Sequence, residues 1–123
     1  MSHLRLWKFV VPRETEDRFL AAYQSDGDWA KLFANAPGFI RTELWQDGDG
    51  IYMTADHWES VAAFESFQAR QGDEYRRLDA ELEGVAGIET FVGAFDLLSS
   101  SAGETWSSVR PSRRETSPIP KRR

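Results

Sequence analysis

The sequence contains no cysteine and only two histidines among its 123 residues. The absence of cysteine excludes disulfide bonds, thiolate nucleophiles, and zinc or iron–sulfur sites ligated by cysteine. It is in keeping with a reducing cytoplasm, where we expect the protein to reside. No apolar run approaches the ~18 residues that a membrane span needs, and the N-terminal stretch MSHLRLWKFVV has strand-like alternation in place of signal-peptide character. We therefore expect no membrane partner.

Basic residues are scarce over residues 1–98, where nine Lys and Arg stand against eighteen Asp and Glu, a net charge of −9. Residues 99–123 hold six Lys and Arg against two Glu, a net charge of +4. An acidic body repels phosphate, so a nucleic-acid partner is not expected except through this basic tail. The tail is rich in Ser, Pro and Arg, which predicts disorder. We therefore place one domain at residues 1–98 and a disordered tail at 99–123.

Apolar periodicity predicts the order β-α-β-β-α-β within the domain. The first helical region begins after Thr15 as N-cap, breaks at SDGD, and resumes after a second cap at Asp28. A long helix begins at Ser60 and ends near Gly84. Strands are predicted at residues 3–11, 39–46, 51–58 and 88–97. This order is the split βαβ, or ferredoxin-like, arrangement of the α+β class, with helices on one face of a four-stranded antiparallel sheet.

The first strand is apolar on both faces, with Trp7 and Phe9 on one parity and Leu4 and Leu6 on the other. Helices cover only one of these faces. A small domain that exposed the other would present a large apolar patch to water. The sequence therefore predicts a homodimer that buries this face.

The stretch TADHW at the end of the third strand holds the most suggestive polar residues. Strand alternation places Asp56 and Trp58 on one face and His57 on the other. If Trp58 faces the helices, the Asp56 carboxylate lies beside an indole, where loss of hydration raises its pKa. His57 then faces the dimer side. We keep two roles open for His57, an interface histidine or a proton relay, and we keep Asp56 open between a cavity carboxylate and a solvated cap.

Four segments resemble the antibiotic biosynthesis monooxygenase family of the dimeric α+β barrel superfamily. They are GDWAKLFANAPGFIRTELWQD, YMTADHWESVAAFESF, EYRRLDAELE and IETFVGAFD, and the resemblance extends over residues 3–97. The resemblance implies a dimeric α+β barrel. It also implies one of several activities, because the family includes cofactor-independent monooxygenases of aromatic polyketides, heme-degrading enzymes and quinol monooxygenases.

The heme-degrading branch pairs the strand-three Trp with an Asn on strand one and a heme-ligating His in the following helix. Trp58 matches, but strand one has no Asn and no His follows His57, so heme is not an expected cofactor. The polyketide-oxidising branch adds a Tyr and an Arg near the same Trp. Here Phe64, not a Tyr, stands six residues after Trp58, and basic residues follow at Arg70, Arg76 and Arg77.

We interpret the protein as a cofactor-independent monooxygenase that oxidises a small aromatic, polyketide-like or quinol compound with dioxygen. Such chemistry needs a dry apolar pocket, a proton acceptor and donors for developing negative charge. The alternative is a non-catalytic, ligand-binding or stress-related dimer, and a third interpretation has the basic tail recruit an acidic partner. The candidate catalytic residues are Asp56, Trp58 and His57. The candidate substrate-binding residues are Tyr23, Trp29, Tyr52, Phe64, Phe67 and Tyr75, and no metal ligands are predicted.

Overall fold

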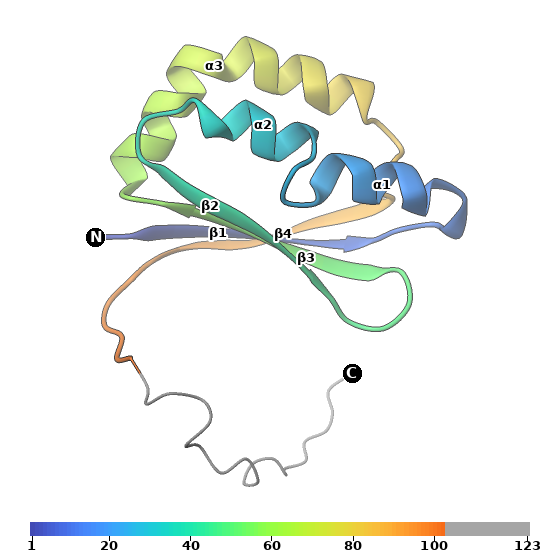
Figure 1. The fold of residues 1–123 in the computed structure, drawn as a ribbon, viewed down its shortest axis with the longest axis horizontal. Helices are drawn as coiled ribbons and strands as arrows, with labels where there is room; N and C mark the ends of the chain where they lie inside the picture. The colour runs from blue at the N-terminus through green and yellow to red at the C-terminus, as the bar shows by residue number, and fades with distance from the viewer. Residues whose placement is uncertain (103–123) are drawn as a thin grey trace, which may run out of the picture.

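The computed structural model describes residues 1–102 (Figure 1). Four strands and three α-helices, with one short 3-10 helix, account for its regular structure, and residues 99–102 follow without any. The remainder of the predicted tail lies outside the described residues. The elements are β1 (His3–Val10), η1 (Arg13–Thr15), α1 (Glu16–Tyr23), α2 (Asp28–Ala34), β2 (Phe39–Gln46), β3 (Ile51–Trp58), α3 (Val61–Glu81) and β4 (Ile88–Asp96).

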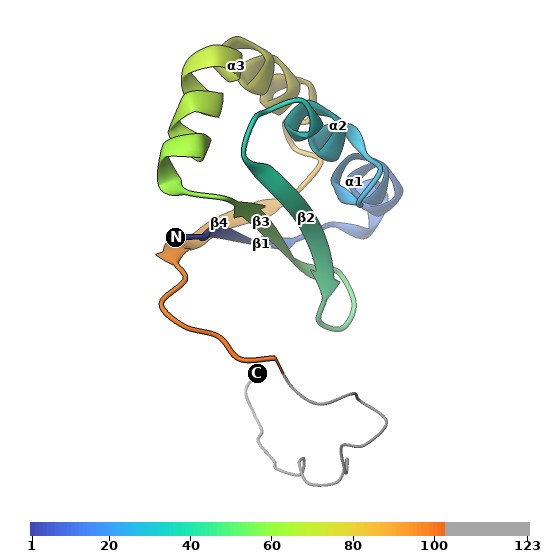
Figure 2. The same cartoon turned by 60° about the vertical axis from the view of Figure 1, so that its left-hand side comes forward.

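The strands form one antiparallel sheet in the order β2-β3-β1-β4. All three α-helices lie on the same face of this sheet, and its other face carries no helix (Figures 1 and 2). The predicted α+β ferredoxin-like order is therefore confirmed, with the first helical region divided into α1 and α2. Because β1 and β3 are the two central strands, their side chains on the helix face lie in the middle of the domain.

The helix caps differ in part from the prediction. Ser60 caps α3 as expected, since its hydroxyl accepts a hydrogen bond from the Ala63 N–H at 3.1 Å. Thr15 stands at the N-cap of α1 but its hydroxyl donates to the Val85 carbonyl oxygen at 2.8 Å instead, which ties α1 to the loop before β4. The N-cap of α2 is Gly27, and Asp28 is the first residue of that helix. The cap prediction for Asp28 was wrong because the first hydrogen bond of the helix, from the Lys31 N–H at 3.0 Å, goes to the Gly27 carbonyl oxygen; the Asp28 carboxylate lies 3.2 Å from Arg18.

The Pro-Gly pair before β2 allows the sheet and α3 to approach closely. Gly38 has φ +87°, and a Cβ atom at this position would lie 2.5 Å from the Cβ of Ala63. Its carbonyl oxygen accepts a hydrogen bond from the Glu59 N–H at 2.7 Å. A larger residue would therefore displace the start of α3 from the end of β3, where Trp58 is located.

Aromatic side chains dominate the core between the helices and the sheet. The largest fully buried residues are Trp58 and Phe19, both 0% exposed, and Phe67 at 2%. The Trp58 ring contacts those of Phe33 and Phe67 with centroids 5.7 Å and 5.3 Å away. Truncation of such a ring to alanine typically costs about 3–5 kcal/mol, so Trp58 has a structural role whatever its chemical role.

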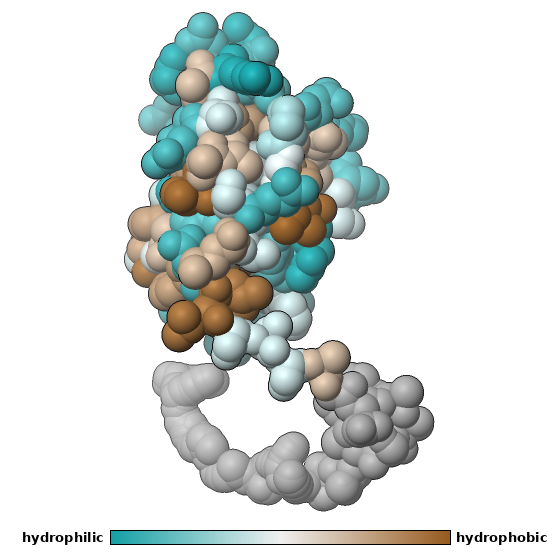
Figure 3. All heavy atoms as spheres, turned by 90° about the vertical axis from the view of Figure 1, so that its left-hand side faces the viewer, coloured by the Kyte–Doolittle hydropathy of each residue, from teal (hydrophilic) through white to brown (hydrophobic). Residues whose placement is uncertain are grey.

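The helix-free face of the sheet and the chain that leaves β4 expose large apolar side chains. Hydrophobic residues gather at the lower end of the folded body in Figure 3, on the side where the sheet lies. Within residues 1–102, no helix is long and apolar enough to cross a membrane. The exposed large apolar residues near this face and its edges include Val10, Ile40, Trp45, Ile88, Phe95, Leu97 and Leu98.

Candidate functional site

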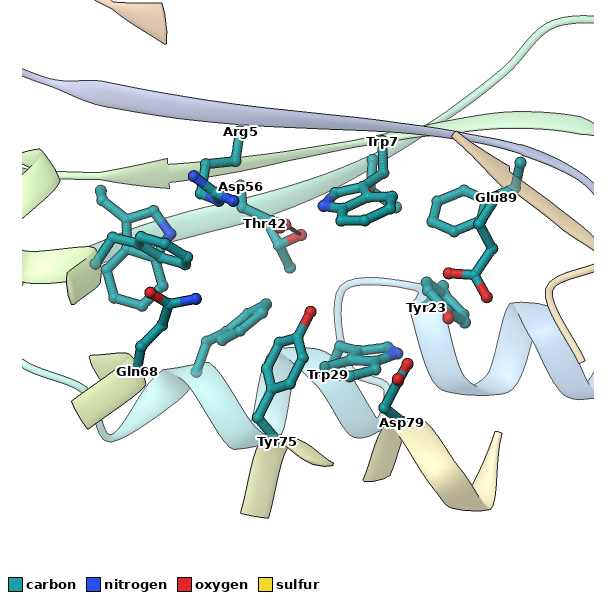
Figure 4. A pocket seen from close by; sticks show the side chains of 15 residues that line it. Arg5, Trp7, Tyr23, Trp29, Thr42, Asp56, Gln68, Tyr75, Asp79 and Glu89 are labelled. Carbon is teal, nitrogen blue, oxygen red and sulfur yellow. Dashed lines mark hydrogen bonds between the residues drawn. The ribbon is translucent and has the colours of Figure 1, made fainter. Parts of the chain in front are cut away.

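A cavity of about 170 Å³ lies between the sheet and the helices. Side chains from all four strands and all three α-helices surround it (Figure 4). Its walls are mainly aromatic, but polar and charged groups from both layers project into it. The lining residues are Arg5, Trp7, Phe9, Tyr23, Trp29, Phe33, Thr42, Thr54, Asp56, Trp58, Phe64, Gln68, Tyr75, Asp79 and Glu89.

Asp56 occupies the sheet wall of the cavity between two polar neighbours. Strand pairing places it opposite Arg5 of β1 on one side and Thr42 of β2 on the other. The Thr42 hydroxyl donates to Asp56 Oδ1 at 2.6 Å, which fixes the carboxylate orientation. Burial raises the pKa of Asp56 to about 6, although Thr42, Arg5 and His57 act in the opposite direction. The carboxylate is thus a proton acceptor whose pKa lies near neutral pH.

Arg5 is held by aromatic rings and not by a carboxylate. The guanidinium carbon lies 3.9 Å from the centroid of Phe64 and 4.9 Å from that of Phe91. Within residues 1–102 it forms no ion pair. Burial lowers the pKa of Arg5, while Tyr75 and Asp56 favour its charged form. A stacked guanidinium retains its N–H groups for a ligand oxygen, so this side chain is suited to binding an anionic or developing anionic group.

A kink in α3 brings Tyr75 over the cavity opposite Asp56. The helix has non-helical dihedral angles at Gln71, with φ −120° and ψ 21°, between its Gln68 and Tyr75 turns. The Tyr75 ring packs against Trp29 with centroids 5.0 Å apart. Burial raises the pKa of the Tyr75 hydroxyl, and Asp79 and Asp56 contribute in the same direction. The Tyr75 hydroxyl therefore stays neutral, and its pKa is affected by charged groups at both ends of the cavity.

Two carboxylates lie at the other end of the cavity from Arg5. Asp79 projects from α3 and Glu89 from β4, and both lie on the side of Tyr23 in Figure 4. Burial and Asp79 raise the pKa of Glu89. The same two carboxylates add to the effect of burial in raising the pKa of Tyr23. Both carboxylates are exposed, and so is Gln68 at the Arg5 end, so lining residues at both ends of the cavity reach solvent.

Six of the nine residues predicted for the site line the cavity, namely Asp56, Trp58, Tyr23, Trp29, Phe64 and Tyr75. His57 does not, because alternation along β3 sends it to the helix-free face, where its Nε2 lies 3.0 Å from Glu43 Oε1. Phe67 packs behind Trp58 in the core. Tyr52 has the parity of Asp56 but lies four residues nearer the β2–β3 hairpin, under α1, where its hydroxyl donates to Glu16 Oε2 at 2.5 Å. Neither Phe67 nor Tyr52 contacts the cavity, so their placement in a substrate site is corrected.

The polar lining residues that the prediction missed are Arg5, Thr42, Thr54, Gln68, Asp79 and Glu89. Strand alternation offered a signal for Arg5, which shares the parity of Trp7 and Phe9 on β1, and for Thr54, which shares that of Asp56 and Trp58 on β3. The arginines considered on α3 do not contribute: Arg76 pairs with Asp73 on the exposed side of the helix, and Arg70 and Arg77 are exposed.

The sequence profile of the antibiotic biosynthesis monooxygenase family matches residues 4–87, more than half of the chain. The protein belongs to the antibiotic biosynthesis monooxygenase family. The matched range contains the cavity residues of β1, β2, β3 and all three α-helices, and ends one residue before β4. No curated protein sequence matches the chain.

Solved structures confirm the fold of this family member. A monooxygenase from the gene ActVA-Orf6 of Streptomyces coelicolor, in complex with the ligand nanaomycin D, is 20% identical with a TM-score of 0.64, covering 84% of this chain and 93% of that one. A mutant of SnoaB, a cofactor-independent oxygenase from Streptomyces nogalater, is 22% identical with a TM-score of 0.60, covering 80% and 95%. A mutant of MhuD, with two manganese protoporphyrin IX molecules bound per active site, is 23% identical with a TM-score of 0.53, covering 82% and 99%.

Proposed function

We propose that this protein is a cofactor-independent monooxygenase that oxidises a small phenol, quinol or polyketide-like aromatic compound with dioxygen. The observation that carries the proposal is that Asp56 and Arg5 lie opposite each other on neighbouring strands in the sheet wall of an aromatic cavity. One is a carboxylate with a pKa raised to about 6, and the other a guanidinium stacked on two rings. Similarity to SnoaB and ActVA-Orf6, named as a cofactor-independent oxygenase and a monooxygenase, supports the same class.

The cavity dimensions favour a compact substrate. A cavity of about 170 Å³ is close in size to an engineered apolar protein cavity of roughly 150 Å³ that binds benzene, so one aromatic ring fits between these walls without rearrangement. A larger ring system has to extend toward solvent, past Asp79 and Glu89 at one end or past Gln68 at the other. Trp58 and Trp29 supply broad walls, and the indole N–H of each has no hydrogen-bond partner among residues 1–102. An oxygen atom of a bound aromatic compound would satisfy such a donor.

The first chemical step assigned to these residues is proton removal. Asp56, oriented by Thr42, accepts the proton of a substrate hydroxyl, and Arg5 stabilises the resulting phenolate. The aromatic walls exclude water, which strengthens both interactions. The electron-rich ring then becomes the reductant of dioxygen, so the protein itself needs no redox group for this step.

The remaining steps balance without another reactant. In a substrate whose ring carbon opposite the hydroxyl bears hydrogen, the phenolate transfers an electron to dioxygen, and the two radicals combine to form a carbon–oxygen bond at that carbon. The proton held by Asp56 returns to the peroxide, which gives a hydroperoxide on a carbon that still bears hydrogen. Loss of that hydrogen together with the terminal hydroxyl releases water and leaves a quinone. One oxygen atom enters the product, the other leaves as water, and all four electrons come from the substrate.

Oxygen uptake tests the proposal directly. Purified protein in chelator-treated buffer is mixed in turn with phenols, dihydroxynaphthalenes, anthrones and quinols, and oxygen consumption and quinone formation are followed together. We expect at least one compound to consume one dioxygen per quinone formed, at a rate proportional to protein concentration. If compounds bind but none is oxidised, the non-catalytic ligand-binding dimer replaces the enzyme as the better account.

We also propose that the helix-free face of the sheet is a homodimer interface. It carries Val10, Trp45 and Phe95 as exposed apolar residues, together with a polar cluster in which Glu43 accepts from Arg41, His57 and Trp45. A stable interface of this type buries more than ~1,000 Å² in total. Analytical ultracentrifugation at micromolar concentration is expected to show a dimer, and Phe95→Glu, which places a charge on the patch, is expected to shift it toward monomer. A wild-type monomer at tens of micromolar would contradict the assignment.

A further inference from the structure

Trp29 brings a hydrogen-bond donor without a partner to the wall of the cavity. The residue is 8% exposed, and its buried indole N–H has no hydrogen-bond partner among the described residues. Trp29 lines the cavity, and Figure 4 shows its indole nitrogen turned toward Tyr23 and Asp79. A buried donor that lacks a partner is unfavourable, so a ligand atom that accepts from this N–H gains a hydrogen bond and removes that cost.

This donor lies away from the end of the cavity that holds Arg5. The Arg5 guanidinium stacks on Phe64, whose ring centroid is 5.6 Å from that of Trp58. Phe33 contacts both tryptophans, with centroids 5.7 Å from Trp58 and 6.1 Å from Trp29. The Trp29 ring is therefore separated from the ring under Arg5 by two other aromatic side chains. A ligand whose phenol oxygen faces Arg5 reaches the Trp29 N–H with a different atom.

The groups around the Trp29 N–H decide which ligand atom fits there. Burial raises the pKa of the Tyr23 hydroxyl, and the nearby Trp29 N–H opposes that rise, although the two groups form no hydrogen bond of acceptable geometry. Asp79 and Glu89 line the same end in Figure 4, and neither forms an ion pair in the described part of the chain. This end therefore offers an N–H donor beside one hydroxyl and two carboxylates.

A ligand group that suits these partners accepts one hydrogen bond and donates another. An ammonium group has no lone pair with which to accept from the Trp29 N–H. A carboxylate accepts, but Asp79 and Glu89 repel it. An ether or ketone oxygen accepts, but it offers no hydrogen to the carboxylates. A hydroxyl accepts from the indole through a lone pair and donates its own hydrogen to a carboxylate or to the Tyr23 oxygen.

We infer that Trp29 is a specificity-determining residue that selects aromatic substrates with a second hydroxyl group. The phenol oxygen of such a substrate faces Arg5 and Asp56, and its second hydroxyl accepts from the Trp29 N–H and donates to Asp79 or Glu89. A fused two-ring phenol extends between these groups, toward the end where the two carboxylates reach solvent. The position of the phenol oxygen rests on the proposed function, whereas the preference for a second hydroxyl is measured without oxidation.

Naphthols test this preference and remain oxidisable by the proposed chemistry, because the ring carbon opposite the hydroxyl of 1-naphthol bears hydrogen. Anaerobic calorimetric titration at pH 7 compares 1-naphthol with 1,5-, 1,6- and 1,7-dihydroxynaphthalene. The best of these three is expected to bind about tenfold more tightly than 1-naphthol, because a buried donor gains a partner. Methylation of its second hydroxyl is expected to lose part of this gain. A carboxylate at the same ring position is expected to bind more weakly than 1-naphthol does.

Trp29→Phe removes the N–H and keeps an aromatic ring. It is expected to bring the affinity for the dihydroxynaphthalene within about twofold of that for 1-naphthol, while the 1-naphthol affinity changes by less than about threefold. Trp58→Phe is the matched control, because it removes the other buried indole N–H of the cavity that has no partner among residues 1–102. It is expected to weaken both ligands by similar factors and to keep the preference for the second hydroxyl.

A measurement on the wild type decides the question if Trp29→Phe does not fold. The Trp29 indole ¹⁵N–¹H signal, identified through contacts of its ring with Tyr75, is expected to move downfield when the dihydroxynaphthalene binds and to move less with 1-naphthol. An indole signal that responds equally to both ligands would overturn the inference.

Equal affinities for 1-naphthol and all three dihydroxynaphthalenes, no binding of any of them, or a preference that survives in Trp29→Phe would also overturn it. If the preference depends on Trp29 but no naphthol consumes oxygen, the proposed oxidation fails and the selection by Trp29 stands. If 1-naphthol and the dihydroxynaphthalenes are oxidised but bind equally, the oxidation stands and the selection fails.

Discussion

The substitution Asp56→Asn is expected to lower kcat by about 100-fold or more while changing the affinity for a phenol by less than about threefold. Asparagine keeps the shape of the side chain and still accepts the hydrogen bond from Thr42, but it cannot take a proton. General-base catalysis typically contributes 10²–10⁴-fold, and a loss confined to kcat is the pattern of a group needed in the transition state. In the wild type, kcat/KM is expected to rise with pH to a plateau above about 6, where Asp56 becomes ionised. Stopped-flow oxygen consumption across pH 5–9 measures both effects.

The same variant is expected to be more stable than the wild type at high pH. Because the folded-state pKa of Asp56 is about 6 and its ordinary value is 3.8, the native protein holds this proton over a range where the unfolded chain has released it. Stability from this group therefore falls as pH rises from about 4 to 6, and it stays lowered above that range. Asparagine has no such cost, so Asp56→Asn is expected to gain about 1–3 kcal/mol at pH 8 and nothing at pH 3. Urea denaturation at the two pH values gives the difference.

His57→Gln is the matched control for Asp56→Asn, because it changes the adjacent residue on the opposite face of β3. It is expected to leave kcat within about twofold, since the imidazole contacts Glu43 outside the cavity. Loss of turnover in His57→Gln with normal turnover in Asp56→Asn would show that the histidine is the proton relay and that Asp56 is not the base.

Arg5→Met is expected to lower kcat/KM by about 100-fold. Methionine keeps an apolar stem between Phe64 and Phe91 but removes the charge that faces the developing phenolate. Removal of one donor to a developing oxyanion typically costs 10²–10³-fold. Arg5 also lowers the pKa of Asp56, so the acid limb of the pH profile is expected to move to higher pH in this variant. A purely structural role for Arg5 would not move that limb.

Arg5→Lys separates charge from stacking. Lysine keeps the positive charge, but it lacks the planar group that stacks on the two rings. We expect an intermediate loss of kcat/KM and an acid limb close to that of the wild type. If Arg5→Met retains full activity, the guanidinium does not stabilise the substrate anion and the assignment of this end of the cavity is wrong.

The periodicity of apolar residues predicted the strands and helices because each element has a continuous apolar face. Alternation along residues 51–58 was enough to place His57 on the opposite face from Asp56 and Trp58, because the face on which a side chain lies depends only on its position within its own strand. Tyr52 shows the limit of the same reasoning. Parity gave its face correctly, but its position along the strand places it under α1 and Phe19, away from the cavity.

The pattern within a single element could not identify the charged residues of the cavity, because their positions in the cavity depend on how different strands and helices pair and pack. Arg5 reaches Asp56 through the register of β1 with β3, and Thr42 reaches it through a register that shifts between Phe39 and Arg41 of β2. Asp79 and Glu89 reach the same end of the cavity only through the packing of α3 over the sheet. A charged residue on a strand or helix is usually solvated, so the sequence favoured the surface for each of these residues.

Isotope labelling measures oxygen transfer by this protein most directly. The phenol or anthrone with the fastest turnover in the uptake assay is incubated with the purified protein under ¹⁸O₂, in chelator-treated buffer with no added flavin, heme or metal. The proposed chemistry predicts one ¹⁸O atom in each quinone, the second in water, and loss of this incorporation in Asp56→Asn. A quinone without ¹⁸O, or incorporation that appears only after a redox cofactor is added, would contradict cofactor-independent monooxygenation.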